Sequence, residues 1–203
     1  SGKCNHIASR LFIHLTPKMI YPITAYGDPV LRKKAAEITP EYPKLTELID
    51  NMFKTMYHSM GVGLAAPQIW LSIRLFVIDA TPFKEDNPEA DGFKKVFINA
   101  EILEEEGPKW KFNEGCLSIP GIREDVDRHP KLIIRYQDIN FDTHTEEYDG
   151  IQARIIQHEY DHIEGILFTD RLTPLKKTLL KGRLNDITKG KVDADYKMRF
   201  YKR

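Results

Sequence analysis

Two histidines stand four residues apart in this chain, at His158 and His162, and Glu159 directly follows the first. On an α-helix, residues four apart lie on the same face, so both imidazoles can bind one metal ion. The glutamate between them is suited to accept a proton from a water on that metal. The pattern therefore predicts a metal-binding helix that other elements must surround. It supplies only two of the three protein ligands that a catalytic zinc-type site uses.

The third ligand is not where such helices most often place it. In metzincins a histidine stands six residues after the second one, but position 168 is Phe168. Gluzincins need a downstream glutamate, and none follows Glu164. Asp170 is the one carboxylate close behind, and it remains the weaker alternative. We favour Cys116, upstream, because a thiolate is a strong ligand for Zn²⁺ or Fe²⁺.

Composition is that of an ordinary globular protein. The 203 residues suffice for one substantial core, and 30 basic residues balance 30 acidic ones. With no net charge, the chain has no overall electrostatic field that would attract nucleic acid or membranes, and we expect no sequence-specific nucleic-acid partner. No apolar run approaches the length of a membrane span. Two cysteines, Cys4 and Cys116, are too few for a disulfide framework and fit a reducing cytosol.

We expect a single domain over residues 19–203. Residues 1–18 contain no acidic residue and begin with Ser1 and Gly2, which is typical of an expression tag or an N-terminal extension of poor order. Organelle import is the weaker explanation of this segment, so we expect a cytoplasmic, bacterial-like protein.

Periodicity predicts the regular elements. Apolar residues at spacings of three and four over 45–56 predict an amphipathic helix with a buried face. Strands are expected over residues 74–79, 95–99, 131–136 and 138–142, with a short one near 146–148. The stretch 61–68, with the sequence GVGLAAPQ, is interpreted as a turn from its own composition, and 104–106 as a solvated acidic turn. A helix should begin after Asp149, with Gln152 completing a capping box, and end at Gly165.

A last helix is expected from Thr173 and Pro174, a threonine cap followed by proline in the first turn. Its predicted apolar stripe consists of four leucines: Leu175, Leu179, Leu180 and Leu184. Residues 171–203 hold eleven Lys or Arg against three Asp. The simpler interpretation is a docked helix with a solvated basic face; the alternative is that this face contacts ribosomal RNA phosphates.

Three motifs in this order resemble the signature motifs of the peptide deformylases. They are GVGLAAPQ at 61–68, EGCLS at 114–118 and QHEYDH at 157–162, and the resemblance spans about residues 19–173. It implies an α+β fold in which antiparallel sheets surround the helix with the two histidines. It also implies a hydrolase that removes the formyl group from the N-terminal formyl-methionine of new polypeptides and releases formate.

The resemblance also assigns residues. The metal ligands would be Cys116, His158 and His162, holding commonly Fe²⁺, with Zn²⁺, Ni²⁺ or Co²⁺ as substitutes. Glu159 would move the proton, while the Leu117 backbone N–H and the Gln68 amide would stabilise the oxyanion. Other positions are expected to bind the substrate: Val62, Gly63 and Gly115 its main chain, Ile151, Ile155, His158 and Glu114 its methionine side chain, and Arg123 the pocket mouth.

Two positions carry further expectations. Arg154 stands where we expect an apolar residue, so the sequence does not decide whether the outer part of the substrate pocket is polar. Asp161 is expected to pair with Arg128 behind the site. The alternatives to a deformylase are a metallopeptidase of different specificity and a domain with a structural metal.

Overall fold

The computed structural model describes residues 19–202 and combines helices with antiparallel sheets, as predicted. The largest sheet has five antiparallel strands in the order β2-β3-β4-β7-β8. Their bounds are Gly63–Ala65, Leu75–Asp79, Lys94–Glu106, Lys131–Gln137 and Thr143–Asp149. A hairpin of β5 (Trp110–Cys116) and β6 (Ile119–Arg128) stands apart from it. The third sheet pairs β1 (Ile23–Thr24) with β9 (Met198–Arg199) in parallel.

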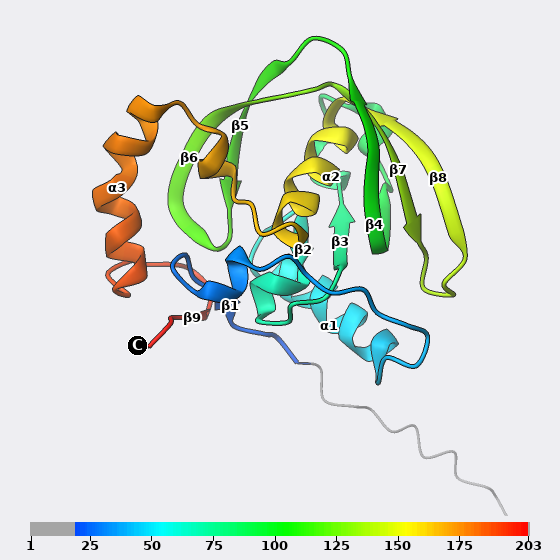
Figure 1. The fold of residues 1–203 in the computed structure, drawn as a ribbon, viewed down its shortest axis with the longest axis horizontal. Coiled ribbons are helices and arrows are strands. Elements are labelled where there is room, and N and C mark those ends of the chain that lie inside the picture. Colours follow the sequence, from blue (N-terminus) through cyan, green and yellow to red (C-terminus); the bar gives the residue numbers. More distant parts are fainter. Residues whose placement is uncertain (1–18, 203) are drawn as a thin grey trace, which may run out of the picture.

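Helix α2 (Gly150–Ile163) lies between the five-stranded sheet and the β5–β6 hairpin (Figure 1). Its apolar residues, such as Ile156 and Ile163, join the core against the sheet, together with the stacked rings of Phe76 and Phe97. The opposite side of the helix faces the hairpin with polar groups. The two histidines are therefore carried by an element enclosed on two sides.

The other helices complete the layers. Helix α1 (Leu45–His58) buries the predicted stripe in a second core cluster against β2 and β3. Helix α3 (Pro174–Thr188) packs on β6 (Figure 1). Five short 3-10 helices connect the elements: η1 (Pro29–Arg32), η2 (Ala66–Ile69), η3 (Thr81–Phe83), η4 (Pro88–Ala90) and η5 (Phe168–Arg171). Within the described residues, no helix combines the length and apolarity needed to span a membrane.

The last helix corrects one prediction. Thr173 caps α3 as expected, accepting a hydrogen bond from the Lys176 backbone N–H. The apolar stripe was wrong in its first half, because Leu175 and Leu179 are 69% and 71% exposed. The residues that dock the helix are Leu180, Leu184 and Ile187, which all lie toward its C-terminal end.

Several boundaries also differ from expectation. Residues 61–68 form strand β2 and η2 in place of a turn, and 104–106 continue strand β4 beside β7. The strand predicted over 138–142 is wrong, because that stretch is the turn between β7 and β8. The β5–β6 hairpin was not predicted. The side chain of Asp149 makes no cap bond to α2, and Gln152 donates instead to the Glu89 carbonyl at 2.8 Å, so the predicted capping box is absent.

Candidate active site

The structure brings the three predicted metal ligands together from two elements. Cys116 ends strand β5, while His158 and His162 lie one turn apart on α2. One donor atom from each lies within 4.8 Å of the other two, and the Cys116 Sγ is 3.4 Å from the His162 Nε2. Asp170, the weaker alternative, is engaged elsewhere: it accepts from Arg32 at 2.5 Å and from the Leu167 N–H at 2.8 Å.

The geometry fits a divalent metal ion. The His158 Nδ1 lies 3.0 Å from the Glu114 carboxylate, which leaves its Nε2 for a metal, as in the carboxylate–histidine–metal arrangement of many sites. A thiolate with two imidazoles suits Zn²⁺ or Fe²⁺ and leaves a coordination position for water. Burial lowers the pKa of His162 well below its ordinary value, so this imidazole is held neutral, the form that binds metal.

Glu159 lies beside these donors in the enclosed region. The residue is 4% exposed, and its Oε2 has no hydrogen-bond partner among the described residues. Burial raises its pKa to about 7, so the carboxyl can exchange a proton near neutral pH. Strand β2 approaches closely here: a Cβ on Gly63 would lie 2.4 Å from the Glu159 Oε1. Glycine at position 63 therefore makes room for the carboxylate.

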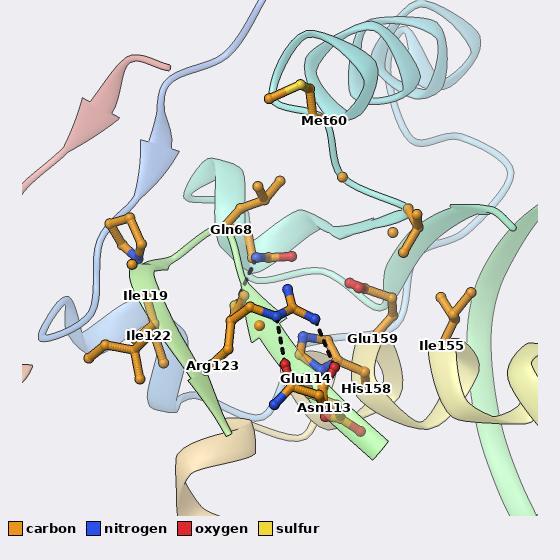
Figure 2. Close-up of a pocket in the computed structure, with 18 of the residues that line it drawn as sticks. Met60, Gln68, Asn113, Glu114, Ile119, Ile122, Arg123, Ile155, His158 and Glu159 are labelled. Atoms are coloured by element: carbon orange, nitrogen blue, oxygen red, sulfur yellow. Dashed lines mark hydrogen bonds and ion pairs between the residues drawn. The ribbon is translucent and has the colours of Figure 1, made fainter. Parts of the chain in front are cut away.

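Gln68 points into the same space from η2. Its Oε1 accepts from the Ala65 N–H at 3.0 Å, which fixes the amide with its nitrogen toward Cys116 and Ser118, at 3.5 and 3.3 Å. Figure 2 shows this amide across the cavity from Glu159. The neighbouring Leu117 belongs to the two-residue turn between β5 and β6.

A buried ionic network lies behind the ligands. Arg128 donates to the Glu114 carboxylate at 2.7 and 3.0 Å and to Asp161 at 2.7 Å, which confirms the predicted Asp161–Arg128 pair. Arg171, which was not predicted, also donates to Asp161 at 2.6 Å. Burial alone would raise the pKa of Glu114, but hydrogen bonds from His158 and Arg128 outweigh it and hold that pKa well below its usual range. The charge on Glu114 in turn orients the His158 ring.

Arg154 resolves the question raised by its position in the sequence. It is 2% exposed and donates to Glu114 at 3.0 Å and to the Val126 and Trp110 carbonyls. Its guanidinium carbon lies 4.5 Å from the centre of the Trp110 ring. The arginine is thus a member of the ionic network: it also lines the cavity, but both of its terminal nitrogens are engaged by Glu114 and the two carbonyls.

A cavity of about 670 Å³ opens onto these groups (Figure 2). All but one of the predicted substrate-binding residues line it: Val62, Gly63, Glu114, Gly115, Arg123, Ile155 and His158. The exception is Ile151, which is 2% exposed and packs in the core against the sheet. Arg123 reaches across the wall to Asn113, donating to its side chain at 2.9 Å and its carbonyl at 2.7 Å.

Several residues that line the cavity were not predicted from the sequence. Apolar walls come from Phe83, Phe112, Ile119, Ile122 and the exposed Met60. A further stretch, residues 193–196, comes from the segment after α3. Neither a motif nor a strong periodicity marks these positions, because they contribute only through contacts with distant parts of the chain.

Known proteins with similar sequences share one description. Residues 20–178 match the family model described as polypeptide deformylase. A peptide deformylase of Christiangramia forsetii is 59% identical over 189 residues, covering 90% of this chain and 96% of that protein. One from Flavobacterium psychrophilum is 57% identical over 188 residues, covering 89% and 97%.

Solved structures agree with the sequence matches. The peptide deformylase from Thermus thermophilus superposes with a TM-score of 0.75 at 39% identity, covering 85% of this chain and 99% of that one. A Plasmodium falciparum peptide deformylase in complex with an inhibitor gives 0.72 at 38% identity, covering 82% and 99%. At these identities the likeness extends beyond the fold.

Proposed function

This chain belongs to the polypeptide deformylase family, and from that premise we propose how its residues remove the N-formyl group from the N-terminal formyl-methionine of a newly made polypeptide. The family is metal-dependent, and the reaction is hydrolysis of a formamide bond that releases formate. Residues 19–203 form one catalytic domain in this proposal. The single observation that carries it is the convergence of Cys116, His158 and His162 beside the unpartnered carboxylate of Glu159.

The three converging residues would hold the metal. Fe²⁺ is the physiological ion that the resemblance to the family implies, and a donor set of one soft thiolate and two imidazoles also suits Zn²⁺, Ni²⁺ or Co²⁺ as substitutes. When bound, the ion supplies Lewis acidity and lowers the pKa of the attacking water. Glu114 keeps the His158 ring in its ligating orientation through the Nδ1 contact.

Glu159 acts as the proton carrier. Its carboxylate takes a proton from the water that attacks the formyl carbon and delivers it to the leaving amine. A pKa of about 7 suits both steps near neutral pH. The developing oxyanion is stabilised by the Leu117 N–H and the Gln68 amide, whose nitrogen is already turned toward this region. One such donor is worth ~3 kcal/mol in comparable sites.

The substrate would lie extended across the cavity. Its main chain would pair with Val62, Gly63 and Gly115, and main-chain pairing tolerates varied residues after the methionine. The methionine side chain would occupy the space near Ile155 and His158, with Arg123 at the mouth. Ile151 supports this wall from behind, since it is buried beneath it in the core.

A direct assay tests the function. The purified enzyme, loaded with Fe²⁺ without oxygen, should release formate from a formyl-methionyl tripeptide and leave its internal peptide bonds intact. An acetyl-methionyl tripeptide is the matched control and should react far more slowly, because acetyl carries a methyl group where formyl carries hydrogen. Cleavage of internal bonds would favour the metallopeptidase alternative, and metal binding without any turnover would favour a structural metal.

We also propose that the exposed face of α3 binds the ribosome, which presents the formylated nascent chains. Lys177 and Lys181 are exposed on this helix, next to the exposed Leu175 and Leu179. Lys176 is already paired with Glu124 at 2.8 Å. The location that fits such a partner is the cytoplasm of a bacterium, the kind of organism from which the curated relatives come.

Co-sedimentation with ribosomes at increasing salt tests this partner. The variant K177E/K181E should bind more weakly than the unchanged protein, with a shallower dependence on salt, because phosphate contacts release counterions. Its formate release from a free tripeptide should not change. Equal sedimentation of both proteins would leave α3 as a docked helix only.

A further inference from the structure

After α3 the chain turns back toward the active cavity. We call residues 190–202 the tail; they follow the stretch that matches the family model, which ends at residue 178. Alternate tail residues face inward: Val192, Ala194, Tyr196 and Met198 are half-buried, and the residues between them are exposed. Residues 193–196 line the cavity. The tail is therefore an extended segment that forms one wall of the site.

The tail is fastened to the body of the molecule directly after this wall. Strand β9 pairs with β1, with the Ile23 and Ala25 N–H groups donating to the Lys197 and Arg199 carbonyls at 2.9 Å each. The Arg199 guanidinium carbon lies 3.7 Å from the centre of the Trp70 ring. Trp70 directly follows η2, the element that carries Gln68.

The tail also contacts the turn that holds the second proposed oxyanion donor. The Tyr196 hydroxyl donates to the Leu117 carbonyl at 2.7 Å. Leu117 and Ser118 form the turn between β5 and β6, where the register shifts after Gly115, so the strand ladder does not fix them. The Ser118 carbonyl is held by the Tyr26 N–H at 2.8 Å. Tyrosines from the two ends of the described chain thus restrain consecutive peptide groups of this turn.

The Leu117 side chain is restrained as well. A Cβ added to Gly61 would lie 2.9 Å from the Leu117 Cδ1, so this side chain packs directly on the glycine backbone. The Leu117 N–H belongs to the peptide group before Leu117 and the Leu117 carbonyl to the one after it. With the side chain and the carbonyl both held, two of the bonds at the Leu117 Cα have fixed directions, and so the direction of its bond to nitrogen is fixed as well. A hydrogen bond of 2.7 Å from a half-buried tyrosine is a geometric constraint of that kind.

We propose that Tyr196 is a positioning residue for the deformylation reaction: by holding the Leu117 carbonyl it fixes the orientation of the Leu117 Cα, and thereby the position from which the Leu117 N–H points at the developing oxyanion. This inference rests on the function proposed above. Because the tail also touches Trp70, it supports both oxyanion donors from outside the motifs that identify the family. Tyr196 would act through Leu117 and need not touch the formyl group.

The variant Y196F removes only the hydroxyl and keeps the ring that packs in the wall. We expect kcat for a formyl-methionyl tripeptide to fall by about fivefold to tenfold, the effect of one lost neutral hydrogen bond. KM should stay within about twofold, because the substrate groove is unchanged. The backbone amide signals of Leu117 and Ser118 should shift in an NMR spectrum of the metal-loaded protein. Y201F is the matched control, since Tyr201 is in the same tail, exposed and outside the cavity.

Three results would overturn the inference. The first is that kcat and KM of Y196F are both unchanged. The second is a rise in KM with kcat unchanged, which would make the tail only a wall of the cavity. The third is a large fall in melting temperature with both kcat and KM impaired, which would make the tyrosine a structural residue. Assaying the protein without any substitution distinguishes these three results from a failure of the proposed function. If it releases no formate, the function itself is wrong, whereas normal release with an equally fast Y196F contradicts the role of Tyr196 alone.

Discussion

Helices α2 and α3 have nearly equal length but opposite arrangements of polarity. In α2 the buried residues include Arg154, Glu159, Asp161 and His162. In α3 two leucines are about 70% exposed, and the lysines face solvent. A buried ion costs several kcal/mol of desolvation unless partners compensate for it. The β5–β6 hairpin and η5 provide such partners for Arg154 and Asp161, and the exception is Glu159, whose unpartnered oxygen belongs to a residue that lines the cavity.

This difference in the burial of polar side chains suits the two helices to different kinds of function. Around α2 the polar groups are held in fixed positions by the ionic network, which is what a reaction centre needs. On α3 Lys177 and Lys181 are exposed to solvent, which suits a contact with a large charged partner. Four predictions test this contrast, each with a matched change.

The largest effect is expected for Glu159→Ala. Loss of the proton carrier should reduce kcat by about a thousandfold or more, within the range for general acid–base groups. Metal content should stay at one ion per chain, because Glu159 is not among the converging donors. Steady-state kinetics and elemental analysis give both values. Asp186→Ala, at an exposed position on α3, should change neither. Loss of metal in Glu159→Ala would contradict the role of Glu159 as a base.

Arg128→Met should destabilise the protein most among changes outside the reaction centre. It leaves Glu114 and Asp161 buried with fewer partners, at a cost of about 3 kcal/mol in the free energy of unfolding. Urea unfolding followed by circular dichroism measures this cost. Arg135→Met removes the pair with Glu101, whose members are both more than half exposed, and should cost under ~1 kcal/mol. Equal costs would mean that the network adds no stability.

Leu184→Ala and Leu179→Ala compare the two faces of α3. Leu184 is 8% exposed and packs in the apolar cluster between α3 and β6, so its truncation should cost about 2–3 kcal/mol. Leu179 is 71% exposed, and its truncation should change stability by less than ~0.5 kcal/mol. Thermal unfolding of both variants measures the two costs. A large cost at Leu179 would mean that this residue is covered in solution.

The smallest effect is a gain. Gly182 lies inside α3, and a Cβ there would meet no atom within 4 Å. Gly182→Ala should therefore raise the free energy of unfolding by about 0.5–1 kcal/mol through the lower entropy of the unfolded chain. The midpoint of urea unfolding measures it, with activity as a check that the site is unchanged. A loss of stability would show that this part of α3 requires glycine.

The sequence predicted what local spacing determines. The stripe of α1 was correct because apolar residues at spacings of three and four have few other uses. The metal ligands were predicted because His158, His162 and Cys116 combine rare donors with a fixed motif order, and the structure places them together. Asp170 remained a weaker alternative on the sequence, and only the structure shows that it is engaged by Arg32 and the Leu167 N–H.

The errors arose where local pattern and tertiary contact disagree. Residues 138–142 alternate like a strand, yet Asp138 accepts from the Asn140 and Asp142 N–H groups and closes a turn. Phe141 lies there at φ +61°, outside the φ range of a regular β-strand. The exposure of Leu175 and Leu179 has a similar cause: helical spacing indicates which residues share a face, but only the position of β6 decides which face is covered.

The pairing of β1 with β9 has a consequence for how the molecule is made. It joins Ile23 to Met198, near the two ends of the described residues, so it can form only after synthesis has passed Met198. Contacts this distant in sequence close late in folding, because they carry the largest entropy cost. The wall that contains Tyr196 depends on this closure. The active cavity of this enzyme is thus complete only when a segment 175 residues after Ile23 has been made and has returned to it.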